Sequence, residues 1–299
     1  MTPPEAPAVG EGGSGAPGGR RQSLRFRYSK LGKIRFTSQR DVARMWERAF
    51  RRVRLPVAWS GGFSPRPLLS FGLALPTGAE SLGEYLDVRL DLGDGLGALA
   101  DLGVAGAVGG HLGGAPGEIL VGSPAGLSDL VDRLSEMLPD GITVQAAAFI
   151  ADDGTSLQQE VSSCTWDLEV FGLTADELAT RVEQLLDAPS VVVRRVRKGR
   201  SVEDDLRPAV RTLSLVPDEA LLPDEGGLGG GPWRLRAELA TQPRGVRPGE
   251  LLEGLGAGLV LARARRRHQW IERDGARWEP LGAGLPEPAP APHAAGRAS

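Results

Sequence analysis

The amino-acid sequence of this 299-residue chain predicts an α+β fold in which the element order β-α-β-β-α-β occurs twice. Segments with alternating apolar and polar residues, typical of strands, recur along the chain. Stretches with helical periodicity and capping residues interrupt these strands at matching places in the two halves. The chain is also long and apolar enough, with 41% hydrophobic residues, to build two ordinary domains.

The first half begins with a strand in which Leu24, Phe26 and Tyr28 alternate with polar residues. After a turn at Gly32, Ser38 is placed to cap a helix whose apolar positions continue at helical spacing to Val53. The predicted strands are Leu24–Tyr28, Val57–Trp59, Glu84–Leu90 and Ile142–Ile150, and the predicted helices begin at Ser38 and span Ser128–Leu138.

The second half repeats this order. Thr174 and Glu177 have the spacing of a capping box, and Pro248 occupies the first position of a short helix, where proline is tolerated. The predicted strands are Cys164–Phe171, Ser190–Val196, Val210–Val216, Trp233–Ala240 and Leu259–Ile271, and the helices run from Thr174 to Leu186 and from Arg247 to Leu255.

These elements predict two tandem ferredoxin-like modules, at residues 23–152 and 160–279. Residues 1–22 contain ten Gly or Pro residues and residues 280–299 contain five prolines, so both ends are predicted to be disordered tails. A Gly-rich insertion, with 12 glycines at residues 91–126, is predicted to interrupt the first module as a flexible segment without a folded element.

The charge is unevenly distributed along the chain. The net charge is −3, but residues 20–78 carry 14 Lys or Arg against only Asp41 and Glu47, a local charge of +12, and the remainder carries −15. A concentrated positive segment indicates an anionic partner.

Several kinds of site are excluded or disfavoured by composition. Cys164 is the only cysteine, so the chain alone cannot form a disulfide, a thiolate zinc site or an iron–sulfur cluster. The three histidines are too few and too scattered to predict a metal centre. We expect no cofactor and no metal, and the lack of an apolar span or signal segment predicts a cytoplasmic protein.

The basic segment and a later basic run are the candidate binding residues. The predicted nucleic-acid contacts are Arg25, Arg27, Lys30, Lys33, Arg35, Arg40, Arg44, Arg48, Arg51, Phe63, Arg66, Arg197 and Lys198. Clustered cations bind repeated phosphates through counterion release, and an aromatic ring on a Gly/Pro loop is suited to stacking on a base. A solvated helix face, and a core position for Phe63, remain the alternatives.

Three motifs carry a family resemblance. They are Lys30-x-Gly32-x-x-Arg35-Phe36-x-Ser38-x-x-Asp41, then Gly62-Phe63-Ser64-Pro65-Arg66-Pro67 continuing to Ser70-Phe71-Gly72-x-Ala74-Leu75-Pro76-x-Gly78, then Glu84-Tyr85-Leu86-Asp87. Over residues 23–280 the chain resembles the radical-SAM-linked protein family, an uncharacterised bacterial domain. The resemblance implies a cobalamin-binding radical SAM protein as partner, and it implies no catalytic residues.

The leading hypothesis is a non-catalytic RNA-binding accessory protein that presents its substrate to a separate radical SAM enzyme. One alternative is a metal-independent ribonuclease, for which Tyr28 and His268 are the candidate proton-transfer residues. Another is a protein-interaction module that binds no nucleic acid.

Overall fold

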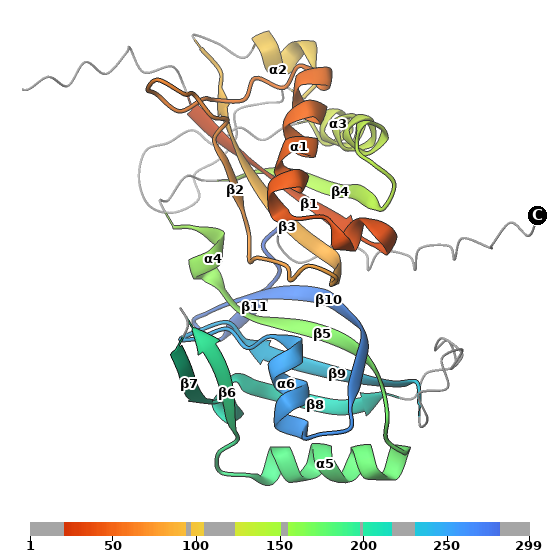
Figure 1. The fold of residues 1–299 in the computed structure, drawn as a ribbon. Helices are drawn as coiled ribbons and strands as arrows, with labels where there is room; N and C mark the ends of the chain where they lie inside the picture. Colours follow the sequence, from red (N-terminus) through yellow and green to blue (C-terminus); the bar gives the residue numbers. More distant parts are fainter. Residues whose placement is uncertain are drawn as a thin grey trace, which may run out of the picture.

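The computed structural model describes residues 21–93, 97–104, 123–150, 155–197, 200–216 and 231–281 of the chain. They form a mixed α+β structure with one nine-stranded mixed sheet and a separate two-stranded hairpin. The N-terminal half lies above the C-terminal half in Figure 1, and strands of both halves belong to the same large sheet. The α+β class predicted from the sequence is confirmed.

The N-terminal half is an antiparallel set of strands covered on one face by helices. Its elements are β1 (Arg21–Lys30), η1 (Gly32–Phe36), α1 (Gln39–Val53), β2 (Leu69–Phe71), β3 (Glu80–Asp91), α2 (Gly97–Asp101), α3 (Pro124–Met137) and β4 (Ile142–Ile150). The strands lie in the order β4-β1-β3, with β2 paired to the far side of β3.

Helix α1 forms as the sequence predicts. The Asp41 backbone N–H donates to Ser38 Oγ over 3.3 Å, so the N-cap satisfies one of the free backbone donors at the helix start. The apolar face of the helix packs on β1, where the ring centroid of Trp46 lies 5.6 Å from that of Phe26 and 5.2 Å from that of Tyr28. These aromatic rings form the centre of the N-terminal core.

In the C-terminal half the four sheet strands lie in the same order relative to the chain as in the N-terminal half (fourth, first, third, second), and a hairpin is added. Its elements are α4 (Leu157–Glu160), β5 (Val161–Phe171), α5 (Ala175–Asp187), β6 (Val192–Arg197), β7 (Arg200–Asp205), η2 (Arg207–Ala209), β8 (Val210–Val216), β9 (Trp233–Ala240), α6 (Pro248–Leu255), β10 (Val260–Arg273) and β11 (Ala276–Trp278). The sheet order is β10-β5-β9-β8, and β6 and β7 form the separate hairpin. The capping box of Thr174 and Glu177 begins α5, as predicted.

The two halves meet along β3 and β10, which pair in parallel at only two positions. Polar side chains reinforce this short ladder. Both Nε and Nη2 of Arg265 donate to Glu80 Oε2, over 3.0 and 2.7 Å, and Arg266 forms a buried ion pair with Glu84. The junction between the halves is therefore held by charged groups as well as by backbone pairing.

Several elements differ from the prediction. Residues 97–104 and 123–126 of the Gly-rich insertion are folded: Leu99 and Val104 are buried in the N-terminal core, and the Val104 carbonyl accepts from the Ser123 N–H at the start of α3. Val57 and Trp59 form only isolated bridges instead of a strand. The hairpin partner β7 and the short strands β2 and β11 were not predicted. Arg21, Gln22, Pro280 and Leu281 belong to the folded structure, and the rest of both predicted tails lies outside the described residues.

Candidate nucleic-acid interface

Helix α1 carries a row of arginines on the side that faces away from the sheet. The packed face is formed by Val42, Trp46, Ala49, Phe50 and Val53. The exposed cations of this helix are Arg40, Arg44, Arg48, Arg51 and Arg52. Those at positions 40, 44, 48 and 52 follow one another every four residues, so their Cα atoms rise in steps of about 6 Å along one side of the helix.

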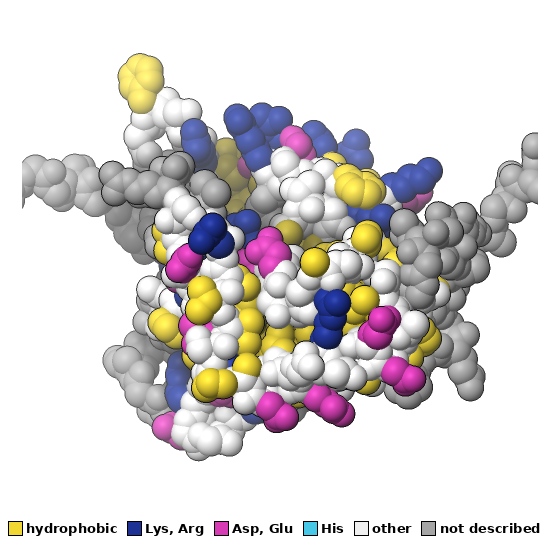
Figure 2. Space-filling view, turned by 60° about the horizontal axis from the view of Figure 1, so that its bottom comes forward, with side chains coloured by type: hydrophobic (Ala, Val, Ile, Leu, Met, Phe, Trp, Pro, Cys, Tyr) yellow, Lys and Arg dark blue, Asp and Glu magenta, His cyan; other side chains and the backbone are white. Residues whose placement is uncertain are grey.

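Few acidic groups neutralise this row. Arg44 lies 3.4 Å from Asp41 and Arg51 lies 3.7 Å from Glu47, and both are exposed pairs of the kind that contribute little stability. Within the described part of the chain, Arg40, Arg48 and Arg52 have no ion pair. Figure 2 shows Lys and Arg side chains gathered along the upper edge of the visible face, with several Asp and Glu side chains along its lower edge.

Three predicted contacts lie inside the protein instead. Arg25 forms a bidentate ion pair with Asp87, over 2.6 and 2.9 Å, and donates to the Pro280 carbonyl. Arg27 donates to Gln145 Oε1 over 2.8 Å, and Lys30 donates to the Thr37 carbonyl over 2.8 Å. Burial lowers the pKa of Lys30. Arg25 and Arg27 are not exposed to a phosphate because Pro280 and Glu279 cover their face of β1, and Lys30 is enclosed by the η1 turn whose carbonyls it contacts.

The two remaining cations before α1 lie at its N-terminal end. Lys33 is exposed. Arg35 is half-buried, 3.3 Å from Glu80, and its guanidinium carbon lies 4.7 Å from the centre of the exposed Phe36 ring. Lys33 therefore adds a cation to the α1 surface, whereas Arg35 also supports the junction with β10.

The loop after α1 presents Phe63 to solvent. Trp59 and Pro67 form an antiparallel bridge at the base of this loop. The Ser60 N–H donates to the Arg66 carbonyl, and the Arg66 N–H donates to Ser60 Oγ. Phe63 at the tip is fully exposed, so the core alternative for this ring does not apply. Arg66 is also exposed.

Two exposed aromatic residues were missed in the sequence. Trp59 is 48% exposed and borders a cavity of about 250 Å³ between the end of α1 and the loop, which Phe50, Arg51 and Pro67 also line. Phe36 is 62% exposed near the start of α1. Trp59 lies in a segment that the sequence predicts as a strand, and such a pattern favours a packed ring. Only its position beside the Gly/Pro loop could have indicated that the ring is exposed. Aromatic rings thus lie near both ends of the arginine row.

The second basic run is largely engaged in a hairpin. Arg194 lies 2.8 Å from Glu203, and Arg195 pairs with Asp204 across the β6–β7 ladder. The side chain of Arg197 and the whole of Lys198 lie outside the described residues. Arg207 donates to the carbonyls of Leu186 and Val210, so it braces the fold through backbone groups.

A family of proteins described as "Uncharacterized protein conserved in bacteria (DUF2344)" matches residues 23–95 and 118–240. The chain belongs to this family. No curated protein matches it. Among solved structures, one chain of "Crystal Structure of a Cbf5-Nop10-Gar1 Complex" is similar at 10% identity and a TM-score of 0.37, over 82% of this chain and 49% of that chain. The DUF2344 chain therefore spans about half the length of that structural relative.

The structure does not bring together the two residues considered for ribonuclease chemistry. Tyr28 is buried beneath α1 against Trp46, and this burial, with the nearby Glu84 charge, raises its pKa well above the usual range. His268 stacks on Trp270 and hydrogen-bonds Glu279 through Nδ1 over 2.9 Å. In the described ranges, no three His, Cys, Asp or Glu side chains are grouped so that they could hold a metal ion. No helix in these ranges is long and apolar enough to cross a membrane.

Proposed function

We propose that this DUF2344 protein is a cytoplasmic RNA-binding accessory protein, without catalytic activity of its own, that presents RNA to a separate radical SAM enzyme. The observation that carries RNA binding is the exposed arginine row of α1, only partly neutralised and flanked by exposed aromatic rings. Repeated phosphates reward such a row because each neutralised phosphate releases condensed counterions.

The exposed rings favour single-stranded or looped RNA. Unpaired bases stack on aromatic side chains, whereas the bases of a duplex are already stacked on one another. Phe63 extends from a loop whose base is fixed by the Trp59–Pro67 bridge, so the ring is presented without a long flexible connection. In this proposal the phosphate contacts on α1 supply most of the affinity, and the base contact at the loop selects unpaired nucleotides.

We further infer that each half is a ferredoxin-like module. The orders β4-β1-β3-β2 and β10-β5-β9-β8, together with the helix positions, support this inference. RNA-binding modules of related topology use the helix-free face of the sheet. In the N-terminal half, Arg25 and Arg27 on that face are buried and engaged, so we place the RNA on the helix side.

The proposal of an enzyme partner rests on the family resemblance, and the cysteine content excludes a radical SAM cluster in this chain itself. A radical SAM cluster requires several cysteine thiolates, and this chain contains only Cys164, which is buried. Any radical chemistry therefore belongs to the partner. Purification of the complex after nuclease treatment tests how the two associate: assembly that persists without RNA supports direct docking, and loss of assembly indicates that RNA bridges them.

The RNA proposal is tested by filter binding of a mixed RNA pool across a salt series. The variant Arg40→Gln/Arg48→Gln removes two exposed cations without an ion pair in the described chain. It should lower the slope of log K against log salt by about 1.4, at about 0.7 per phosphate contact with a single strand. The control Arg273→Gln/Arg277→Gln changes the net charge equally at two exposed arginines of β10 and β11, and it should leave the slope unchanged. Equal effects of both variants, or no binding at low salt, would contradict the proposal.

A further inference from the structure

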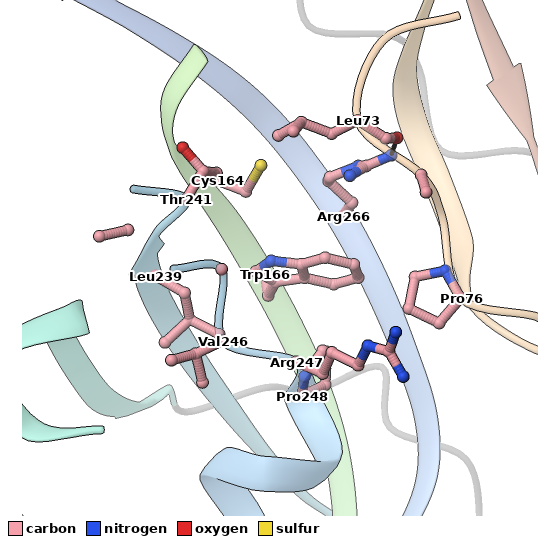
Figure 3. A pocket seen from close by; sticks show the side chains of 13 residues that line it. Leu73, Pro76, Cys164, Trp166, Leu239, Thr241, Val246, Arg247, Pro248 and Arg266 are labelled. Atoms are coloured by element: carbon pink, nitrogen blue, oxygen red, sulfur yellow. Dashed lines mark hydrogen bonds between the residues drawn. The ribbon is translucent and has the colours of Figure 1, made fainter. Parts of the chain in front are cut away.

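A second site lies where the two halves meet, at a cavity that RNA binding on α1 does not use. The cavity has a volume of about 280 Å³. The loop after β2 contributes Leu73 and Pro76, β5 contributes Cys164 and Trp166, and the segment before α6 contributes Val246, Arg247 and Pro248. Figure 3 shows these segments, distant in the sequence, converging around the indole of Trp166.

The lining favours a flat apolar group. In Figure 3 the Trp166 ring lies between Arg266 and Leu73 on one side and Arg247 and Pro248 on the other, with Pro76 across the opening. Leu239 and Val246 complete an apolar wall. An engineered apolar cavity of about 150 Å³ holds benzene, so this cavity has room for one or two rings.

The two arginines of the cavity have different roles. Arg266 is 2% exposed, and its Nε and Nη2 donate to Glu84 Oε1 over 3.0 and 2.7 Å, while Nη2 also donates to the Leu73 carbonyl. Its charge is thereby neutralised, and its guanidinium carbon, 5.4 Å from the Trp166 ring centre, fixes the position of the indole. Arg266 is a positioning residue.

Arg247, in contrast, is an exposed cation on the cavity lining, and its side chain has no ion pair within the described part of the chain. The nearby Glu250 carboxylate is already engaged by Arg244, at 3.2 Å, and by the Arg247 backbone N–H, at 3.0 Å. An arginine in this position offers paired donors that match a carboxylate or a phosphate group.

We propose that this cavity binds a small molecule with one or two flat apolar rings and a single carboxylate or phosphate group, the ring against Trp166 and the anion at Arg247. The site provides binding without covalent chemistry. Burial raises the pKa of the Cys164 thiol in its lining to about 11, so this thiol remains protonated at neutral pH, and the Thr241 hydroxyl donates to the Val161 carbonyl. This inference is independent of RNA binding.

The test uses the full chain with 5-fluorotryptophan at its six tryptophans. Benzoate and phenyl phosphate are the two anionic probes, benzamide is the neutral ring, and acetate and inorganic phosphate are the anions without a ring. We expect a saturable shift of the Trp166 fluorine signal, assigned with Trp166→Phe, with at least one anionic probe, and at least tenfold weaker binding of benzamide. The probe that binds more tightly identifies the anionic group.

Calorimetry on unlabelled protein provides a measurement that does not depend on the folding of the Trp166 variant. Arg247→Gln should weaken binding of the preferred probe at least tenfold, and Arg133→Gln, an equal charge change on α3, should leave it unchanged. The proposal is overturned if neither anionic probe binds, if benzamide or the ring-free anions bind equally well, or if Arg247→Gln has no effect.

Discussion

Substitution of Glu84 by glutamine should destabilise the protein strongly, because this carboxylate neutralises a buried arginine from the other half of the chain. Glu84 on β3 accepts three hydrogen bonds from Arg266 on β10, at 2.7 to 3.0 Å, and both side chains are almost fully buried. The glutamine side chain keeps the shape but removes the negative charge. The charge of Arg266 then remains buried without a counterion.

The size of the effect follows from this burial. Removal of one partner of a buried ion pair costs about 3–5 kcal/mol, and the glutamine oxygen still accepts one hydrogen bond, so we expect a loss of about 3 kcal/mol. For a folded region of this size such a loss lowers Tm by about 6–12 °C. The same substitution at Glu203, which pairs with Arg194 on the exposed hairpin, should cost less than about 1 kcal/mol.

Urea unfolding followed by tryptophan fluorescence and circular dichroism measures both variants. The double variant Glu84→Gln/Arg266→Met removes the unpaired charge as well. It should recover at least half of the lost stability because this buried site can hold an apolar side chain in place of the arginine. The single variant Arg266→Met is measured in the same way. A loss below about 1 kcal/mol for Glu84→Gln, or a double variant whose loss equals the sum of the losses of Glu84→Gln and Arg266→Met, would refute the reasoning.

Three further predictions concern other buried or exposed groups. Burial opposes ionisation of Glu80, but hydrogen bonds from Arg265 and the Gly32 N–H outweigh it and lower the pKa of Glu80 below its usual 4.5. Ionised Glu80 therefore stabilises the fold above its unfolded pKa, and this contribution is lost as pH falls through the folded pKa. The variant Glu80→Gln should show a flatter decline of unfolding free energy below about pH 5. An unchanged decline would contradict this prediction. Cys164, whose pKa is about 11, should react slowly with iodoacetamide at pH 8 and at a normal thiol rate in 8 M urea, and equal rates in the two states would contradict its burial. Phe63→Ala should leave the unfolding free energy within about 0.5 kcal/mol of wild type while weakening RNA binding by about 1–3 kcal/mol in filter assays, and unchanged RNA binding would remove the stacking role.

The local elements were predicted well because their signals are local. The Ser38 cap and the apolar spacing of α1, the Thr174 capping box, and the alternating strands β4, β8 and β9 all depend on residues within one turn or one strand. The hairpin strand β7 was not predicted because it is almost entirely polar, and its stability comes from pairing with β6. The folded part of the Gly-rich insertion was missed because Leu99 and Val104 are buried only through distant contacts.

The candidate interface likewise has features that local sequence patterns predict and features that depend on distant contacts. The sequence by itself determined that the basic residues are concentrated in one segment and that the α1 arginines lie opposite an apolar stripe, since helical periodicity assigns both faces. Only the tertiary structure decided that Arg25 and Arg27, which alternate correctly for an exposed sheet face, are buried beneath Pro280 and Glu279. A strand pattern states which side chains share a face but not what covers that face, because the covering residues come from the opposite end of the chain.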